Sequence, residues 1–162
     1  MNIAFVSSQG GHSGQIKLIF NEEVIGKNNA IFITETPKQD RTPKKNSFSN
    51  KFTTYFFKKD YLLTPSPYRY FKTLIALIKL FKKEKIDVIV TNGAQLSIPA
   101  VIGARLLGIK VIFLETFIRV KTTTWTAKVC YPFSNIFLVQ HPGMIKKYGS
   151  KAKFKGSVIW YL

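Results

Sequence analysis

Cysteine and histidine are scarce in this sequence, which contains only Cys130, His12 and His141. A single cysteine cannot form a disulfide within the chain, and this suits a reducing compartment. The sequence has neither a CxxC nor an HExxH pattern, so we expect no metal site and no bound cofactor. A Walker A loop and a GxSxG pattern are also missing, which argues against a P-loop nucleotidase and against a serine hydrolase of that type.

Acidic residues are also few, since 8 Asp and Glu oppose 25 Lys and Arg and leave a net charge of +17. Such an excess predicts an anionic partner, which would be nucleic acid, an anionic membrane surface or a phosphorylated substrate. No RNA-binding aromatic signature, helix-turn-helix or zinc module stands out in the sequence. A basic nucleic-acid-binding domain is therefore only an alternative, and we expect no nucleic acid as a partner.

Long hydrophobic runs are absent as well. Lys79 and Arg105 interrupt the two most apolar segments, so no stretch reaches the roughly 18 uncharged apolar residues of a transmembrane helix. The first residues lack the basic segment and the apolar core of a signal peptide. We therefore expect a cytosolic protein, or one bound at a membrane without crossing it.

The hydrophobic residues that are present, 46% of 162, are enough for one domain with a buried core. The most informative stretch is 87–120, where β-branched runs at 87–91 and 110–115 predict strands buried on both faces. Between them, 97–107 predicts a helix, with Pro99 near its start and Gly108 just past its end. Such a unit implies a parallel sheet with a right-handed crossover.

We therefore predict an α/β fold, a Rossmann-like parallel sheet with helices on both faces, as a single domain over residues 1–162. Further strands are expected at 2–8, 29–35, 52–57, 136–140 and 155–159, and further helices at 15–25, 68–85 and 127–131. Residues 36–50 are rich in polar residues and include two prolines, which predicts a flexible loop.

Ligands bind outside the carboxyl ends of the strands in open parallel sheets, and the sequence places its polar residues there. Those residues are Gly10, Gly11 and His12 after the first strand, Asn92, Gly93 and Gln95 after 87–91, and Glu115, Thr116 and Arg119 after 110–115. The GGHSG run does not match GxGxxG, so a dinucleotide site is not indicated. The glycines form either a phosphate- or sugar-binding loop or only a tight turn. His12 lies where it could act as a base or hold an anion.

The segment 68–85 combines an apolar helical face with many lysines. Its apolar residues at helical spacing are Phe71, Leu74, Ile75, Ile78 and Phe81, and Leu77 and Leu80 widen that face. One interpretation is a crossover helix packed on the sheet with a solvated lysine face. The other is an interfacial helix that meets anionic lipid. In the second case the membrane contacts are Tyr68, Tyr70, Phe71 and Leu77 with Lys72, Lys79, Lys82 and Lys83.

Several motifs in this order resemble a known family. They are Gly10-Gly11-His12, Gly93 in the 87–120 stretch, the E-[ST]-x-x-R-V pattern at Glu115, Thr116, Arg119 and Val120, and the VQxP pattern at Val139, Gln140 and Pro142. Lys147-Tyr148 and the KFKGSVI run follow. Together they resemble the asparagine-linked glycosylation protein fourteen family and its bacterial PssD/CpsF-type relatives. The chain departs from the family at Ala127, where T-G-K is common, at His141, where VQWP is usual, and in lacking the N-terminal membrane helix of the eukaryotic branch.

This resemblance implies the acceptor-side half of a split GT-B glycosyltransferase, similar to the N-terminal half of MurG. A separate subunit would bind most of the UDP-sugar, and this chain would recruit it to the membrane and bind a polyprenyl-diphosphate-linked acceptor. The pathway would be exopolysaccharide, capsule or lipid-linked oligosaccharide synthesis by an inverting transferase. Attachment would be peripheral, at the cytoplasmic face of the membrane. An alternative is a non-catalytic membrane adaptor that activates a partner glycosyltransferase.

The candidate site residues follow from the motifs and the loop positions. His12 is the first candidate for the catalytic base and Glu115 is the second. Arg119 would either hold a diphosphate or fix its loop by pairing with Glu115. The expected substrate-binding residues are Gly10, Gly11, Asn92, Gly93, Thr116, Arg119, Lys128 and Gln140.

Overall fold

The computed structural model describes residues 1–8, 10–19, 25–26, 28–35, 53–57 and 67–157. These residues form a seven-stranded sheet in which every pairing is parallel. In sheet order the strands are β3 (Thr53–Phe57), β2 (Asn29–Glu35), β1 (Asn2–Val6), β4 (Val88–Thr91), β5 (Lys110–Leu114), β6 (Ile136–Val139) and β7 (Ala152–Phe154). The predicted Rossmann-like parallel sheet is confirmed. The flexible loop expected at 36–50 lies outside the described residues.

The strand order reverses direction at β1. The chain runs from β1 through β2 to β3 at one edge, and then returns to place β4 on the other side of β1. The register pairs Val6 with Ile33 of β2 and with Thr91 of β4. A reversal of this kind leaves a crevice beyond the carboxyl ends of the two central strands, and ligands bind there in open α/β sheets. We therefore expect a ligand site beyond the carboxyl ends of β1 and β4, and we call this region the crevice.

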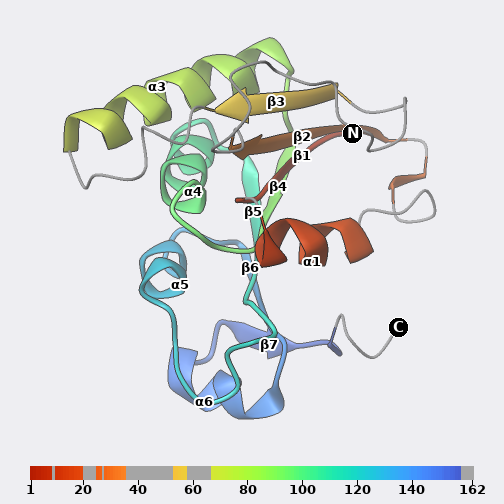
Figure 1. The fold of residues 1–162 in the computed structure, drawn as a ribbon, viewed down its shortest axis with the longest axis vertical. Helices are drawn as coiled ribbons and strands as arrows, with labels where there is room; N and C mark the ends of the chain where they lie inside the picture. The colour runs from red at the N-terminus through yellow and green to blue at the C-terminus, as the bar shows by residue number, and fades with distance from the viewer. Residues whose placement is uncertain (9, 20–24, 27, 36–52, 58–66, 158–162) are drawn as a thin grey trace.

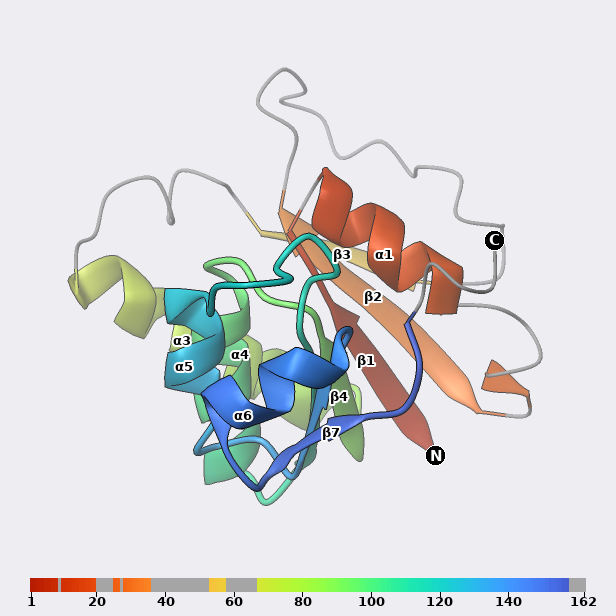
Figure 2. The same cartoon turned by 90° about the horizontal axis from the view of Figure 1, so that it is seen from below.

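Helices cover both faces of the sheet, because alternate strand residues point to opposite sides. Ala4 and Val6 of β1 belong to the large core that includes residues of α3 (Pro67–Lys83), α4 (Ser97–Leu106) and α5 (Trp125–Cys130). Ile3 and Phe5 pack with Ile16 of α1 (Gly11–Ile19) in a smaller core. Figures 1 and 2 show α1 on one face and α3 and α4 on the other. A short 3₁₀ turn, η2 (Pro142–Met144), and α6 (Ile145–Tyr148) complete the large core near β7.

Two element predictions need correction. The last described strand is Ala152–Phe154, where Ala152 is buried and pairs with Phe137 of β6. Of the strand expected at 155–159, residues 155–157 are not in a strand, and 158–159 lie outside the described residues. Helix α1 begins at Gly11 rather than at Gln15, and Gly14 N donates to Gly10 O at 3.1 Å in its first turn. Glycines are tolerated there because the first helical N–H groups have no partner within the helix.

Helix α3 is a crossover helix that packs on α4, as one of the two interpretations expected. Leu77 and Phe81 are fully buried, while Tyr68, Phe71 and Ile75 are exposed. Leu77 was predicted as a membrane contact, and that prediction is wrong because no part of its side chain reaches the surface. Lys72, Lys79, Lys82 and Lys83 are exposed as expected, and Tyr70 is half-buried. No helix among the described residues is long and apolar enough to cross a bilayer.

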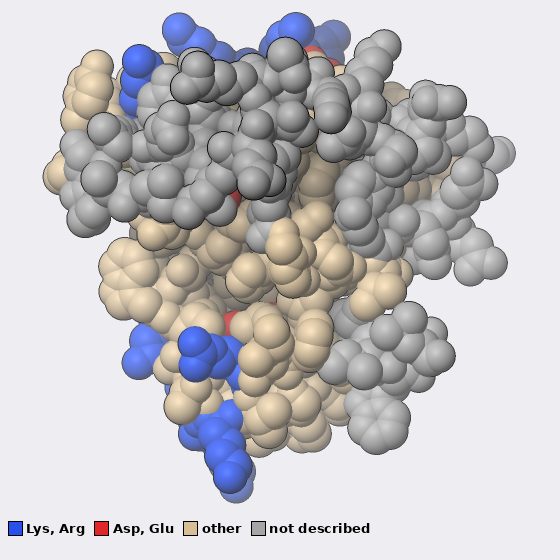
Figure 3. Space-filling model, in the orientation of Figure 1, with Lys and Arg blue, Asp and Glu red and all other residues tan. Residues whose placement is uncertain are grey.

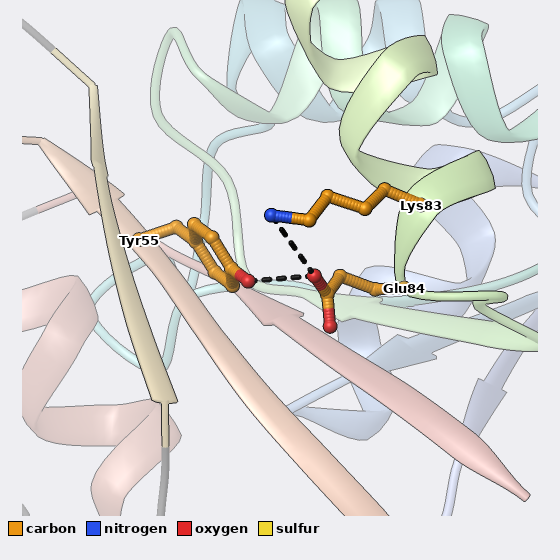
Figure 4. A network of polar contacts seen from close by, with 3 residues as sticks. All are labelled: Tyr55, Lys83 and Glu84. Carbon is orange, nitrogen blue, oxygen red and sulfur yellow. Dashed lines mark hydrogen bonds and ion pairs between the residues drawn. The ribbon is translucent and has the colours of Figure 1, made fainter.

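The far end of α3 is tied to the edge of the sheet. Tyr55 of β3 donates its hydroxyl to the carboxylate of Glu84 at 2.6 Å, and Lys83 Nζ lies 4.0 Å from the same oxygen (Figure 4). The bond and the negative charge of Glu84 raise the pKa of Tyr55. This contact links the edge strand to the segment that leads into the central strand β4.

Close packing of α3 on α4 depends on Gly103. A Cβ atom at this position would lie 3.2 Å from Leu74 Cδ1 and 3.3 Å from Ile78 Cγ1. We expect Gly103→Val to lower the free energy of unfolding by about 1–3 kcal/mol, because extra atoms would force the two helices apart. Chemical denaturation measures this change. Arg105→Val places the same β-branched residue at an exposed position of α4 and should cost less; equal losses in both variants would contradict the packing argument.

Candidate functional site

Loops after three adjacent strands meet at the crevice. The β1–α1 turn carries His12, the β4–α4 loop carries Asn92 and Gly93, and the β5–α5 loop begins at Glu115. Since β1, β4 and β5 are neighbours in a parallel sheet, their carboxyl ends share one edge. The structure therefore brings the predicted residues of these loops to the same side of the domain.

Asn92 joins the first two loops through a network of hydrogen bonds. Its Nδ2 donates to His12 O at 2.5 Å and to Gln15 Oε1 at 3.3 Å. Its Oδ1 accepts from Ser7 Oγ at 3.0 Å, and its backbone carbonyl lies 3.0 Å from His12 Nδ1. Asn92 and Gln15 are almost fully buried. A buried, paired amide of this kind fixes the two loops relative to each other.

The bond to Asn92 also determines the tautomer of His12. A backbone carbonyl can only accept, so Nδ1 must carry the proton and Nε2 is the nitrogen that can receive one. Burial lowers the pKa of His12, although the bond to Asn92 opposes this effect. The imidazole is therefore neutral at pH 7 and has the protonation state of a general base.

Gly93 allows the imidazole to approach the β4–α4 loop. Its φ of +101° lies in a region that other residues rarely adopt. A Cβ atom there would lie 3.6 Å from His12 Cε1 and 3.9 Å from Phe113 Cζ. Glycine at position 93 therefore satisfies both the backbone conformation and the contact with the histidine ring.

Glu115 is held by its own loop and by α6. Its Oε1 accepts from Thr116 N at 3.0 Å and from Thr124 Oγ1 at 3.5 Å, and its Oε2 accepts from the Tyr148 hydroxyl. The same hydroxyl accepts from Thr124 N at 3.2 Å. Burial raises the pKa of Glu115, against the lowering effect of these bonds and of the charge of Arg119. Burial and the nearby carboxylate raise the pKa of Tyr148.

One of the two roles expected for Arg119 is to fix its loop by pairing with Glu115. Arg119 is exposed and donates to Thr122 Oγ1 at 3.1 Å, and it forms no ion pair with Glu115 in the described part of the chain. His141 supplies another fixed point, because its Nε2 donates to Phe117 O at 2.8 Å. The histidine that departs from the family pattern therefore binds the loop backbone.

The other predicted residues fall into two groups. Thr116 and Gln140 are buried just past the ends of β5 and β6, at the carboxyl edge of the sheet. Gly10 and Gly11 begin α1 with open space around their Cα atoms, and Lys128 is exposed on α5. No hydrogen bond joins His12 to Glu115 within the described residues.

Sequence reasoning missed the partners that position these groups. Ser7 and Gln15 fix Asn92, and Thr124 and Tyr148 fix Glu115. Two serines ending an otherwise apolar first strand were a usable signal for Ser7. Tyr148 is 33 residues from Glu115, and no spacing rule links them.

Neither a metal site nor a reactive thiol is found in the part of the chain that the structure describes. No group of three or more His, Cys, Asp and Glu residues within that part could hold a metal ion. Cys130 is buried, and burial together with the charge of Glu115 raises its pKa to about 12. The thiol is therefore protonated at neutral pH and is no nucleophile.

Comparison with known proteins agrees with this arrangement. The family "Oligosaccharide biosynthesis protein Alg14 like" matches residues 3–158. The human UDP-N-acetylglucosamine transferase subunit ALG14 is 24% identical over 181 residues, which cover 98% of this chain and 83% of the human protein.

Bacterial relatives are longer than this chain. The UDP-N-acetylglucosamine–N-acetylmuramyl-(pentapeptide) pyrophosphoryl-undecaprenol N-acetylglucosamine transferase of Clostridium perfringens is 28% identical over 144 residues, covering 88% of this chain but 38% of that enzyme. The crystal structure of Acinetobacter baumannii MurG superposes with a TM-score of 0.75 at 15% identity, over 97% of this chain and 45% of MurG. This chain therefore spans less than half of these bacterial proteins, and its fold is that of the N-terminal half of MurG. From the family match over nearly its whole length, the chain belongs to the Alg14-like family of oligosaccharide biosynthesis proteins.

Proposed function

We propose that this chain is the acceptor-binding and membrane-recruiting subunit of a two-component inverting glycosyltransferase. The reaction transfers a sugar from a UDP-sugar to a polyprenyl-diphosphate-linked saccharide, in lipid-linked oligosaccharide, exopolysaccharide or capsule synthesis. The observation that carries this proposal is the neutral His12, held by Asn92 and Gly93 at the switch point of a domain that is half of a MurG-like enzyme. The chain works at the cytoplasmic face of the membrane.

The proposed reaction uses His12 as the base. Its Nε2 takes the proton of the acceptor hydroxyl while Nδ1 stays bound to Asn92 O. The hydroxyl oxygen then forms a bond to the anomeric carbon of the sugar, and the bond from that carbon to the UDP oxygen breaks. Attack opposite the leaving group inverts the configuration. Asn92 acts as the positioning residue, because its side chain and its carbonyl both hold the histidine segment.

The acceptor diphosphate is assigned to the cationic and glycine groups around the crevice. Gly10 and Gly11 lie at the start of α1, where backbone N–H groups favour an anion. Arg119 and Lys128 are exposed on the neighbouring β5–α5 region and supply positive charge. Thr116 and Gln140 remain predicted substrate contacts at the buried end of the site.

Glu115 is better suited to positioning than to proton transfer. Its carboxylate already accepts hydrogen bonds from Thr116, Thr124 and Tyr148 and is 2% exposed. A base that exchanges protons with substrate must be within hydrogen-bond reach of it. We assign Glu115 to fixing the β5–α5 loop.

A separate subunit is supported by the human relative, which is named as a transferase subunit. Small-molecule sites form preferentially between domains, and the fold of this chain matches the N-terminal half of MurG. The partner would supply the donor-binding domain. Helix α3 would contact anionic lipid through Tyr68, Tyr70, Phe71 and the exposed lysines 72, 79, 82 and 83, without Leu77.

The split-enzyme proposal is tested by reconstitution. The purified chain is assayed with UDP-N-acetylglucosamine and a polyprenyl-diphosphate sugar, alone and together with the donor-binding subunit encoded nearest to it. We expect transfer only with both subunits, because the proposed site lies between the acceptor-side domain and a donor-binding domain. Full activity of the chain alone would contradict the proposal.

Replacing the base tests the chemistry. We expect His12→Ala to lower turnover of the reconstituted enzyme by about 10²–10⁴-fold, the usual contribution of a general base. Affinity for the partner subunit, measured by calorimetry, should not change. Unchanged turnover would instead favour the non-catalytic adaptor.

The pH dependence of kcat/KM also tests the role of His12 as the base. Because burial lowers the pKa of His12, kcat/KM should rise with pH through a midpoint below the ordinary histidine value of 6.5 and be level above it. This acidic limb should be absent from the residual activity of His12→Ala. A midpoint above 6.5, or a limb that persists in the variant, would assign the titration to another group.

The role of Glu115 is tested through Tyr148. Tyr148→Phe removes the hydroxyl that donates to Glu115 and accepts from Thr124 N. We expect the free energy of unfolding to fall by about 1–3 kcal/mol, because a buried carboxylate loses a donor. Tyr68→Phe removes an exposed hydroxyl and should have little effect.

Turnover separates the two roles of Glu115. If Glu115 positions the loop, Tyr148→Phe and Glu115→Gln should lower turnover by similar factors. A much larger loss in Glu115→Gln alone would make Glu115 the base.

A further inference from the structure

The loop between β5 and α5 carries apolar side chains that face solvent. Ile118 is 68% exposed, Val120 is 53% exposed, and Trp125, the first residue of α5, is 69% exposed. We call residues 117–125 the apolar loop. None of the three side chains belongs to the core, to which α5 contributes Ala127 and Cys130.

The backbone of the apolar loop is held by polar contacts. Phe117 O accepts from His141, Arg119 N donates to Thr116 O at 3.3 Å, and Thr124 N donates to the Tyr148 hydroxyl. Lys147 Nζ also donates to Lys121 O. The loop therefore presents Ile118, Val120 and Trp125 outward from a fixed backbone.

The part of the chain that follows the apolar loop contains basic residues and no acidic ones. Glu115 is the last acidic residue of the sequence, and it is buried. Figure 3 shows Lys and Arg side chains gathered over the region of α5 and α6, apart from those along α3. The basic residues between 116 and 157 are Arg119, Lys121, Lys128, Lys146, Lys147, Lys151, Lys153 and Lys155.

We propose that the apolar loop is a membrane-contact element of its own, separate from α3, which inserts Ile118, Val120 and Trp125 into the interfacial region of an anionic bilayer. The lysines around it then meet the lipid phosphates. This inference rests on the proposed function in so far as a lipid-linked acceptor brings the crevice to a membrane.

The composition favours a bilayer over a protein partner. Lysine is depleted in protein–protein interfaces, whereas it is attracted to anionic lipid surfaces. Tryptophan is enriched at the level of the lipid headgroups. Apolar and basic residues alternate at Ile118, Arg119, Val120 and Lys121, which places apolar groups and cations at the same depth.

The position of the loop gives this contact a consequence for the substrate. The loop follows β5, next to β4 at the carboxyl edge of the sheet, and Figures 1 and 2 both show it beside α1. Insertion there would bring the crevice mouth, with His12, to the lipid surface. A diphosphate anchored in the bilayer would then reach the site while its polyprenyl chain stays in the lipid.

Trp125 provides the direct measurement. The sequence has two tryptophans, so Trp160→Phe leaves Trp125 as the only indole. The full chain carrying this change is mixed with vesicles of phosphatidylcholine, with or without phosphatidylglycerol, that contain brominated acyl chains. We expect a blue shift and quenching of Trp125 emission with the anionic vesicles, and much less with phosphatidylcholine alone.

Two variants relate insertion to affinity. Ile118→Ser with Val120→Ser should weaken partitioning to the anionic vesicles by about tenfold, since two apolar side chains no longer enter the interface. Leu106→Ser is the matched control, because Leu106 is 67% exposed but lies at the end of α4 that leads to the amino end of β5. It should bind like the unaltered chain.

Three results would overturn the inference. They are absence of vesicle binding, vesicle binding without quenching of Trp125, and a blue shift that occurs only when the partner subunit is added. The proposed function is judged separately, with a short-chain, water-soluble diphosphate acceptor. The double serine variant should retain transfer to that acceptor and lose transfer to the polyprenyl acceptor in vesicles, whereas failure on both acceptors in the unaltered complex would count against the glycosyltransferase itself.

Discussion

Asn92 is the residue on which the arrangement of the crevice depends. It lies directly after β4, and its amide reaches Ser7, His12 and Gln15 on the other side of the switch point. Without that amide, the two loops would keep only the bond from His12 Nδ1 to the backbone carbonyl of residue 92 among the hydrogen bonds of the described residues. The tautomer of His12 follows from the same residue, because the carbonyl of Asn92 accepts a hydrogen bond from Nδ1–H. The geometry of the two loops and the tautomer of the histidine are therefore both set by one buried asparagine.

Glu115 has a parallel role one strand further along the sheet. It collects donors from Thr116, Thr124 and Tyr148 and so closes the base of the apolar loop against α6. The cost of burying a carboxylate is offset by these donors, because a buried charge needs hydrogen bonds to remain ionised. The two networks thus hold different groups, since the Asn92 network holds the candidate base His12 and the Glu115 network holds the apolar loop.

The sheet and the catalytic candidate could be predicted from the sequence, because both depend on local patterns. β-branched runs marked β2, β4, β5 and β6 to within about two residues, the usual precision of strand ends. The Gly-Gly-His turn after an apolar strand marked His12. The AKF segment of β7 has no such pattern, and it becomes a strand only because β6 offers it an edge.

The remaining features depend on contacts between residues that are far apart in the sequence. The helical spacing of α3 is compatible with two overlapping apolar faces. The face that packs on α4 is the one with Leu74 and Ile78, because Gly103 has no side chain to block them. Leu77 consequently turns inward and Phe71 outward. The pairing of Glu115 with Tyr148 and the exposure of the apolar loop likewise depend on packing between elements that no sequence window contains.

The strand order also determines when, during folding, the contacts around His12 can form. Ser7 and Asn92 are 85 residues apart, and β1 cannot acquire its second neighbour before β4 exists. Contacts of such long sequence separation form late, because the entropy of closing the chain must be overcome first. During synthesis the first half of the chain emerges with one side of β1 unpaired and with no partner for His12. The environment of the candidate base His12 is therefore complete only when the central sheet is complete, so a nascent or truncated chain would carry this histidine without the contacts that fix its tautomer and without the burial that lowers its pKa.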